Sequence, residues 1–177
     1  MLNGINLEGL SQYTELITKQ PKEAISSYAI TAKWQGGVSS TISTHNQKIG
    51  SKEVIKKFSF DIDEPEELLG NNKNPTPQDY LLGGLAGCMM VGFVVGATNK
   101  GIKLESVDLK IGGDLNLRGF LNVDKTASIG FEELFFEFNV KGSGTQKDYD
   151  LIIKEVQQFS PNYKTIADPV RISVKTV

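Results

Sequence analysis

The sequence predicts an α+β fold in which helices cover one face of a mostly antiparallel sheet. A charge-free apolar run from Tyr80 to Ala97 has the composition of a long buried helix. The segments before and after it alternate apolar and polar residues, as strands with one buried face do. A second helical pattern follows over 146–159, so helices and strands are grouped rather than strictly alternating, which is typical of α+β proteins.

Length and composition narrow the class of protein. The chain has 177 residues, a formal net charge of -2, one His and one Cys. We expect an N-terminal helical extension over 1–24 and a main domain over 25–177. The charges are dispersed, so neither nucleic acid nor a membrane surface is an expected partner. A single Cys with a single His forms no disulfide and no metal cluster, so no metal or cofactor is expected. The start of the chain lacks the pattern of a secretory signal, and a cytoplasmic location is expected.

The first third of the chain predicts one helix followed by strands. Asn6 can cap a short amphipathic helix that runs to Lys19. Strands are expected over 27–34 and 38–44, with Trp34 as a core anchor. The second strand is rich in Ser and Thr, so it is either an edge strand or a strand that pairs with another chain. We further expect a loop over 45–50, a third strand over 54–63, and a loop over 64–76 that could hold one helical turn after Pro65.

The central helix has clear start and stop signals. Thr76 can cap it, Pro77 suits its first position, and Asp79 favours the positive end of the helix dipole. Gly101 can end it in a left-handed conformation. The later segments are predicted as strands over 103–113, 131–141 and 169–177, a turn-rich connection over 114–124, and an amphipathic helix over 146–159 that residues 160–162 end.

Because the central helix is apolar almost all round, a second layer must cover it. A second copy of the chain would do so, which predicts a homodimer with the two central helices in or near the interface. The alternative is that the N-terminal helix and the 64–76 loop cover it within one chain.

Cys88, on the central helix, is the first candidate for chemistry. A lone Cys on an apolar helix is commonly an inert small hydrophobe, and a reactive thiol would need a nearby cation. Gly83, Gly84 and Gly87 weaken the helix, which makes sense if another backbone or a ligand comes close beside Cys88. Arg118 could bind a carboxylate or phosphate, pair with a thiolate, or form a surface ion pair. We expect the other polar candidates to be solvated: His45 and the acidic group Asp61, Asp63, Glu64, Glu66 and Glu67.

Several spaced motifs resemble the OsmC/Ohr superfamily, from about residue 27 to 177. They are Pro75-x-Pro77-x-Asp79-Tyr-Leu-Leu-x-x-Leu-Ala-x-Cys88, Ala97-x-x-x-Gly101-Ile, Val107-x-Leu-x-Ile-x-Gly-Asp114-Leu-x-Leu-Arg-Gly-Phe-Leu121, Phe159-Ser-Pro161 and Asp168-Pro-Val170. Residues 1–24 resemble the extra N-terminal helix of a longer OsmC-like subgroup. The resemblance implies an intertwined α+β homodimer in which two long helices pack against sheets built from both chains, with a site at the dimer interface.

The resemblance also implies a chemistry. In the peroxidase members one cysteine attacks an organic hydroperoxide, a second resolves the sulfenic acid as a disulfide, and an Arg and a Glu activate the first thiol. Cys88 matches the first cysteine, Ser160 stands where the second would be, and Gln78 stands at the position of the Glu. No arginine lies within 27–60, where the activating Arg belongs. The residues that could replace it are Lys33, Lys48, Lys52, Lys56, Lys57 and Arg118.

These observations leave three functional hypotheses. The first is a one-cysteine hydroperoxide reductase of oxidative-stress defence, in which Cys88 is oxidised and an external thiol restores it. The second is a non-catalytic dimer that binds a small hydrophobic, lipid-like ligand in its interface pocket, with Gln78, Arg118 and Ser160 among the lining residues. The third is a structural or stress-related partner without a ligand.

Overall fold

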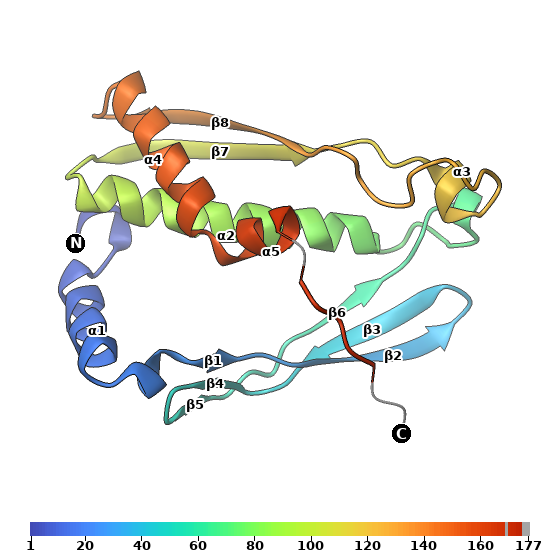
Figure 1. Cartoon of the computed structure of the whole chain (residues 1–177), viewed down its shortest axis with the longest axis horizontal. Coiled ribbons are helices and arrows are strands. Elements are labelled where there is room, and N and C mark those ends of the chain that lie inside the picture. The colour runs from blue at the N-terminus through green and yellow to red at the C-terminus, as the bar shows by residue number, and fades with distance from the viewer. Residues whose placement is uncertain (169, 175–177) are drawn as a thin grey trace. The chain divides into compact units, whose positions relative to one another are not determined.

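Every strand pair among the residues that the structure describes is antiparallel, and these strands form three separate sheets (Figure 1). The computed structural model describes residues 1–168 and 170–174. The helices are α1 (Leu7–Lys19), α2 (Pro77–Asn99), α3 (Leu117–Phe120), α4 (Gln146–Phe159) and α5 (Pro161–Ala167), and 3-10 turns lie at Leu2–Gly4, Pro21–Ala24 and Glu66–Leu68. The predicted α+β class is confirmed, although the strands do not join into one sheet within this chain.

The strands fall into two sheets before α2 and one after it. The first sheet has the order β1 (Ser26–Ser27), β4 (Gln47–Ile49), β5 (Lys52–Val54); the second has the order β2 (Ile30–Gly36), β3 (Ser39–Thr44), β6 (Ser59–Ile62); the third pairs β7 (Leu104–Gly112) with β8 (Phe135–Gly142). The chain divides into two compact units. We call Asn6–Leu81 the sheet unit, and residues 1–5 together with the chain from Leu82 onward the core unit.

The sheet unit has almost no hydrophobic core of its own. Among its residues, all of which the structure describes, Ile42 is the one apolar side chain that is buried. Trp34 is 73% exposed, so its prediction as a core anchor is wrong. Its indole N–H instead donates to the Gly37 carbonyl at 2.9 Å, inside the β2–β3 turn. Strand β3 lies between β2 and β6, so it is a central strand and not the edge strand that its polar sequence suggested.

Two other strand predictions in this unit need correction. Residues 47–49 form β4 where a loop was expected, and the single strand expected over 54–63 is broken into β5 and β6. Side-chain hydrogen bonds take up backbone N–H groups at the break. Asn46 Oδ1 accepts from the Lys56 N–H at 3.0 Å, and the Thr44 hydroxyl accepts from the Phe58 N–H at 3.2 Å. Such local side-chain bonds compete with strand pairing, and hydropathy alone does not reveal them.

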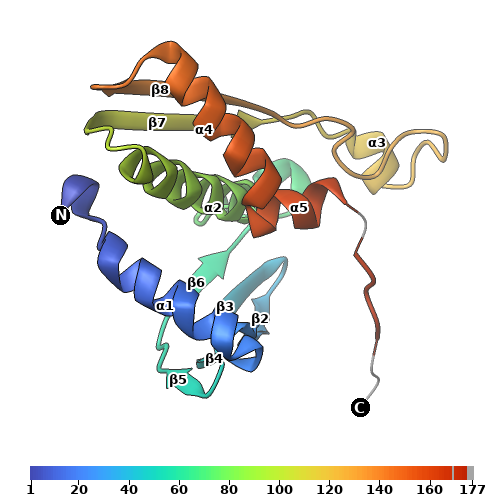
Figure 2. The ribbon, with the colours of Figure 1, turned by 60° about the vertical axis from the view of Figure 1, so that its left-hand side comes forward.

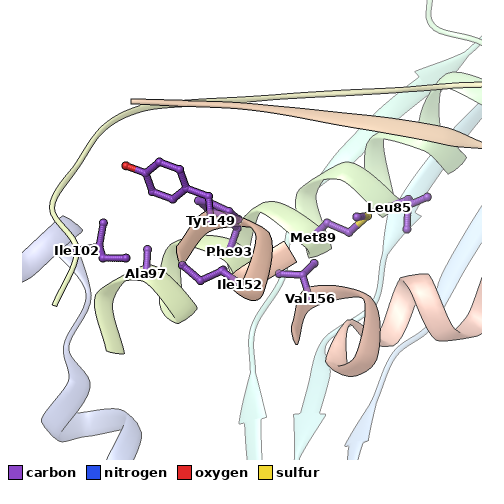
Figure 3. Close-up of a cluster of buried hydrophobic side chains, with 8 residues drawn as sticks. All are labelled: Leu85, Met89, Phe93, Ala97, Ile102, Tyr149, Ile152 and Val156. Carbon is purple, nitrogen blue, oxygen red and sulfur yellow. The ribbon is translucent and has the colours of Figure 1, made fainter. Parts of the chain in front are cut away.

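The core unit places two helices on one face of the β7–β8 ribbon (Figures 1 and 2). The alternate residues of both strands pack toward the helices, and the intervening residues are exposed. Figure 3 shows the core between α2 and α4 as a row of eight side chains: Leu85, Met89, Phe93, Ala97, Ile102, Tyr149, Ile152 and Val156. Phe93 stacks on Phe138 of β8, with ring centroids 4.8 Å apart. This cluster fixes how α2 and α4 lie on the ribbon.

Helix α2 is capped as its sequence predicts. The Thr76 hydroxyl accepts from the Asp79 N–H, and the Asp79 carboxylate accepts from the Thr76 N–H at 2.8 Å, which is a reciprocal capping box. At the other end Gly101 has φ +71°. The Gly101 N–H donates to Thr98 O and the Ile102 N–H to Ala97 O, which satisfies the last carbonyls of the helix.

Burial of α2 is confined to one stripe, so the prediction that the helix is buried all round does not hold within one chain. Leu81 and Val91 are 47% and 66% exposed. A Cβ added to Gly83 or Gly87 would meet nothing within 4 Å. By length and composition α2 could also cross a membrane, but in the core unit it packs as a core helix. An apolar face of α2 is therefore left open.

The side chain of Asn3 anchors residues 1–5 at the end of α2. Its amide donates to Thr98 Oγ1 at 3.0 Å and to Ile102 O at 2.8 Å, and its carbonyl accepts from the Leu104 N–H at 2.9 Å. Asn3 has φ +49°, a conformation that Asn tolerates better than most residues. One side chain thus satisfies polar groups of both α2 and the start of β7.

The second half of the chain differs from the prediction at three places. Strand β8 begins at Phe135, later than the expected 131–141 strand, and the turn-rich connection contains the single-turn helix α3. A further helix, α5, follows α4 where the sequence predicted only an end. The strand expected over 169–177 is not formed over 170–174, and residues 169 and 175–177 lie outside the described residues.

Gly119 of α3 tests how tightly this β7–β8 connection is packed. A Cβ at Gly119 would lie 2.1 Å from the Ser128 carbonyl oxygen, so Gly119→Ala must displace backbone. We expect it to lower the free energy of unfolding by about 1–3 kcal/mol, the usual cost of overpacking. Gly130→Ala is the matched control, because a Cβ there meets nothing within 4 Å. Urea unfolding, monitored by far-UV circular dichroism, measures the difference. Equal unfolding midpoints for the two variants would contradict this packing.

Candidate functional site around Cys88 and Ser160

The site centres on the sulfur of Cys88, which lies on the part of α2 that belongs to the core unit. Cys88 is partly buried, one residue before the fully buried Met89 and beside the open Gly87. The Ser160 hydroxyl donates a hydrogen bond to the Cys88 Sγ at 3.1 Å. The structure therefore brings together two of the four residues that were singled out from the sequence.

Ser160 sits where α4 ends and α5 begins. It is only 5% exposed, and its backbone N–H donates to Val156 O at 2.9 Å. Its hydroxyl also accepts from the Tyr163 N–H at 3.3 Å, which caps α5. Sequence reasoning missed this helix, although a Ser followed by Pro161 is a helix-start signal that could have revealed it.

A second hydrogen bond ties α5 to α2 one turn before Cys88. The Asn162 amide donates to the Gly84 carbonyl at 2.8 Å. A Cβ at Gly84 would lie 3.8 Å from that amide, which is an ordinary contact. Neither Gly84 nor the open Gly83 and Gly87 is therefore required by a close approach within the core unit. Because glycines have no side chains, nothing protrudes from the face of α2 beside Cys88, and that face is accessible.

The core unit supplies a neutral group to the sulfur, not a charged one. Among its described residues, no Lys or Arg side chain is hydrogen-bonded to Cys88. Arg118 donates through Nη2 to Asp124 Oδ2 at 2.6 Å, inside the connection that contains α3. This is the surface ion pair that was one of its three interpretations. The lysines considered as substitutes, at 33, 48, 52, 56 and 57, belong to the sheet unit.

Gln78 lies on the first turn of α2, ten residues before Cys88, and is half-buried. Its neighbour Asp79 is the residue that closes the capping box with Thr76. An amide at position 78 cannot ionise, so it contributes a donor and an acceptor but no charge.

The acidic group before α2 is not a uniformly solvated face. Asp63 is 1% exposed, and its carboxylate organises the 64–76 loop by accepting from Ser39 Oγ at 3.0 Å and from the N–H groups of Asn71 and Lys73 at 3.1 and 3.2 Å. The backbone N–H of Glu64 is the largest of the causes that lower the pKa of Asp63, while burial opposes it. Within the described residues no three His, Cys, Asp or Glu side chains are placed to hold a metal ion.

Glu64 behaves in the opposite way. Burial, followed by the charges of Asp63 and Asp79, raises the pKa of its carboxyl. Its Oε2 is buried without a hydrogen-bond partner among the described residues. Asp63 and Glu64 are therefore adjacent carboxyls whose environments move their pKa values apart.

An open groove of about 300 Å³ lies within the core unit. Its lining residues are Asn3, Met90 and Val94 together with the first residues of β7: Leu104, Glu105, Ser106 and Val107. The volume is at the lower end of the range for small-molecule sites, and four of the seven lining side chains are apolar.

Comparisons with known proteins identify the relatives of this chain. The family model described as OsmC-like protein matches residues 70–175. A solved OsmC-like protein from Mycoplasma pneumoniae is 19% identical, with a TM-score of 0.64 over 80% of this chain and 88% of that one. An OsmC-like protein of unknown function from Vibrio cholerae is 12% identical, with a TM-score of 0.62 over 80% and 94%.

A third solved structure carries a functional name. It is an organic hydroperoxide resistance protein, OsmC, from Legionella pneumophila, 21% identical, with a TM-score of 0.52 over 80% of this chain and 90% of that one. At these identities the structures show a shared fold. No match was found among curated protein sequences.

The buried Asp63 generates a prediction about acid stability. Because its pKa is lowered in the folded state, it stabilises the fold above the unfolded-state pKa of about 3.9 and loses that contribution as the pH falls through the folded-state pKa. We expect Asp63→Asn to lower the urea midpoint at pH 7 and to flatten its fall between pH 4 and pH 2. The fluorescence of Trp34, the single Trp of the chain, reports on the same unit. Asp108→Asn, on the exposed face of β7, is the control. The prediction is refuted if the urea midpoint of Asp63→Asn falls with decreasing pH as steeply as that of the wild type.

Proposed function

This chain belongs to the OsmC-like protein family, and on that basis we propose that it is a one-cysteine, thiol-dependent hydroperoxide reductase acting through Cys88. The carrying observation is the 3.1 Å contact between the Ser160 hydroxyl and the Cys88 sulfur. It supports the sequence match, which puts Ser160 where the peroxidase members of the family have their second cysteine. The name of the Legionella relative points to the same substrate class. We further propose that the protein is soluble and cytoplasmic.

The proposed reaction balances with an external thiol as reductant. The Cys88 thiolate attacks one peroxide oxygen of ROOH; an S–O bond forms, the O–O bond breaks, and the alkoxide takes up a proton and leaves as ROH. Cys88 is thereby oxidised to a sulfenic acid. One external thiol attacks the sulfenic sulfur and releases water, and a second cleaves the mixed disulfide. Overall, ROOH and two thiols give ROH, water and one disulfide, and no metal or cofactor takes part.

Access to Cys88 agrees with this scheme. Cys88 is partly exposed, and Gly83 and Gly87 leave open space on the same helix. A serine in the second position cannot close a disulfide, so the sulfenic acid must be reduced by a thiol from outside the chain.

A second candidate is a carrier for a small hydrophobic ligand. The observation that favours it is the groove next to α2, whose apolar lining is Met90, Val94, Leu104 and Val107. In this case Cys88 would be a structural residue, and the ligand would be lipid-like.

We also propose that the active form is a homodimer. Two observations support it: the sheet unit buries one apolar side chain, and α2 exposes Val91 one turn after the open Gly87. A single chain leaves these apolar surfaces uncovered, and a second copy is the simplest cover.

The reductase proposal predicts a loss of turnover on removing one sulfur. Wild-type protein should reduce cumene hydroperoxide with dithiothreitol, and Cys88→Ser should fall to the uncatalysed rate because no other Cys is present. Ser160→Cys should form an internal disulfide, seen as a loss of two hydrogens in the intact mass. Equal rates for wild type and Cys88→Ser would refute the reductase. Native mass spectrometry of those samples with a fatty acid would then test the carrier.

The dimer proposal predicts that a charge at Val91 separates the subunits. Burying an unpaired carboxylate costs several kcal/mol, so Val91→Asp should weaken association by about 100-fold or more. Light scattering after size-exclusion chromatography measures the change. Asn139→Asp, on the exposed face of β8, adds the same charge away from α2 and should leave the dimer intact. A monomeric wild type would refute the proposal directly.

A further inference from the structure

We propose that Ser160 is a positioning residue for Cys88: its hydroxyl donates to the sulfur and favours the thiolate that attacks. The inference deepens the proposed reductase and rests on it. It gives the position a different task from the one that its cysteine counterpart has in the peroxidases. A serine there is not merely the absence of a resolving thiol, because its oxygen lies 3.1 Å from the sulfur.

The direction of the hydrogen bond follows from the other partner of the hydroxyl. A serine hydroxyl has one proton to donate and lone pairs to accept with. The Tyr163 N–H can only donate, and it points at Ser160 Oγ at 3.3 Å. One lone pair therefore faces Tyr163, and the hydroxyl proton is free to point at Cys88. A donor aimed at sulfur stabilises the thiolate more than the neutral thiol, because the thiolate is the better acceptor.

The fold holds this donor in place. Ser160 is 5% exposed, and its N–H is bonded to the carbonyl of Val156, which belongs to the buried core. Tyr163, which caps the arrangement, packs edge-on against Phe136 of β8. Asn162 adds a bond to the α2 backbone at Gly84. A donor with so many constraints cannot easily rotate away, which is the requirement for positioning a reacting atom.

Two ion pairs engage charged groups of the helices near the sulfur. Lys164 of α5 forms an ion pair at 2.6 Å with Asp168, the residue that follows this helix, and Glu155 of α4 is bonded to Lys100 at 2.8 Å. The groups that face the sulfur from α5 are then the Ser160 hydroxyl and, behind it, the Tyr163 backbone. Among the described residues of the core unit, the hydrogen bond to the sulfur comes from Ser160.

The test uses the single Cys as its own reporter. The rate of alkylation by iodoacetamide is measured from the intact mass of the protein between pH 5 and pH 10. Because the chain has one Cys, this rate reports on Cys88 alone. Ser160→Ala removes the donor but also the cap of α5. Ser160→Gly removes the donor while keeping a residue that caps nearly as well. Ser160→Thr restores a hydroxyl.

We expect both Ser160→Ala and Ser160→Gly to be alkylated about tenfold more slowly at pH 7, and Ser160→Thr to return toward the wild-type rate. A purely structural role would change the unfolding midpoint without moving the profile. Profiles of the Ala and Gly variants that superimpose on wild type, with the fold intact by circular dichroism, would overturn the proposal.

The same protein samples separate this inference from the reductase. Alkylation needs no hydroperoxide. A wild type that does not reduce hydroperoxide but shows the Ser160 shift refutes the reductase and leaves the positioning of Cys88 in place. Normal turnover with superimposed profiles refutes the positioning alone.

Discussion

The close contact between α2 and α4 is the constraint on which the core unit depends. It is possible because glycines stand where the helices meet: a Cβ at Gly96 would lie 3.0 Å from Ile152 Cγ2, and one at Gly92 would lie 3.4 Å from Val156 Cγ2. Larger residues would push α4 outward. The end of α4 would then carry Ser160 away from Cys88, since Val156 and Ser160 are joined by one helical hydrogen bond. Packing at the glycines thus sets the geometry at the sulfur.

The chemistry that follows from this geometry is modest in strength. In the core unit the sulfur contacts a neutral hydroxyl, whereas the resemblance to the peroxidases assigns an arginine and a glutamate to activate the thiol. Hydrogen bonds from neutral donors are about half as strong as those from charged ones. Gln78 keeps the shape of the glutamate without its charge. For the proposed reductase, a thiolate supported only by serine predicts slower turnover than one activated by an arginine.

Sequence patterns were sufficient where structure is set locally. The caps of α2 and the bounds of α4 follow from residues within one or two turns, and the structure has them as predicted. The patterns failed where side chains take over backbone partners, as Asn46 and Thr44 do between β5 and β6. They failed at Trp34 because an apolar residue does not reveal whether its own chain covers it. Spacing could match Cys88 and Ser160 to a family, but their contact needs the α2–α4 packing, which is a long-range property.

The anchoring of Asn3 has a consequence for how the chain is threaded. The chain leaves the core unit after Ile5 and re-enters it at Leu82, so the sheet unit is an insertion with two covalent connections. The hydrogen bonds of Asn3 join residues 1–5 to the rest of the core unit, across 95 to 101 residues of sequence. Closing so long a loop is entropically slow, and local helices form long before it. Residues 1–5 are thus expected to dock late, after α2 and β7 already exist to receive them.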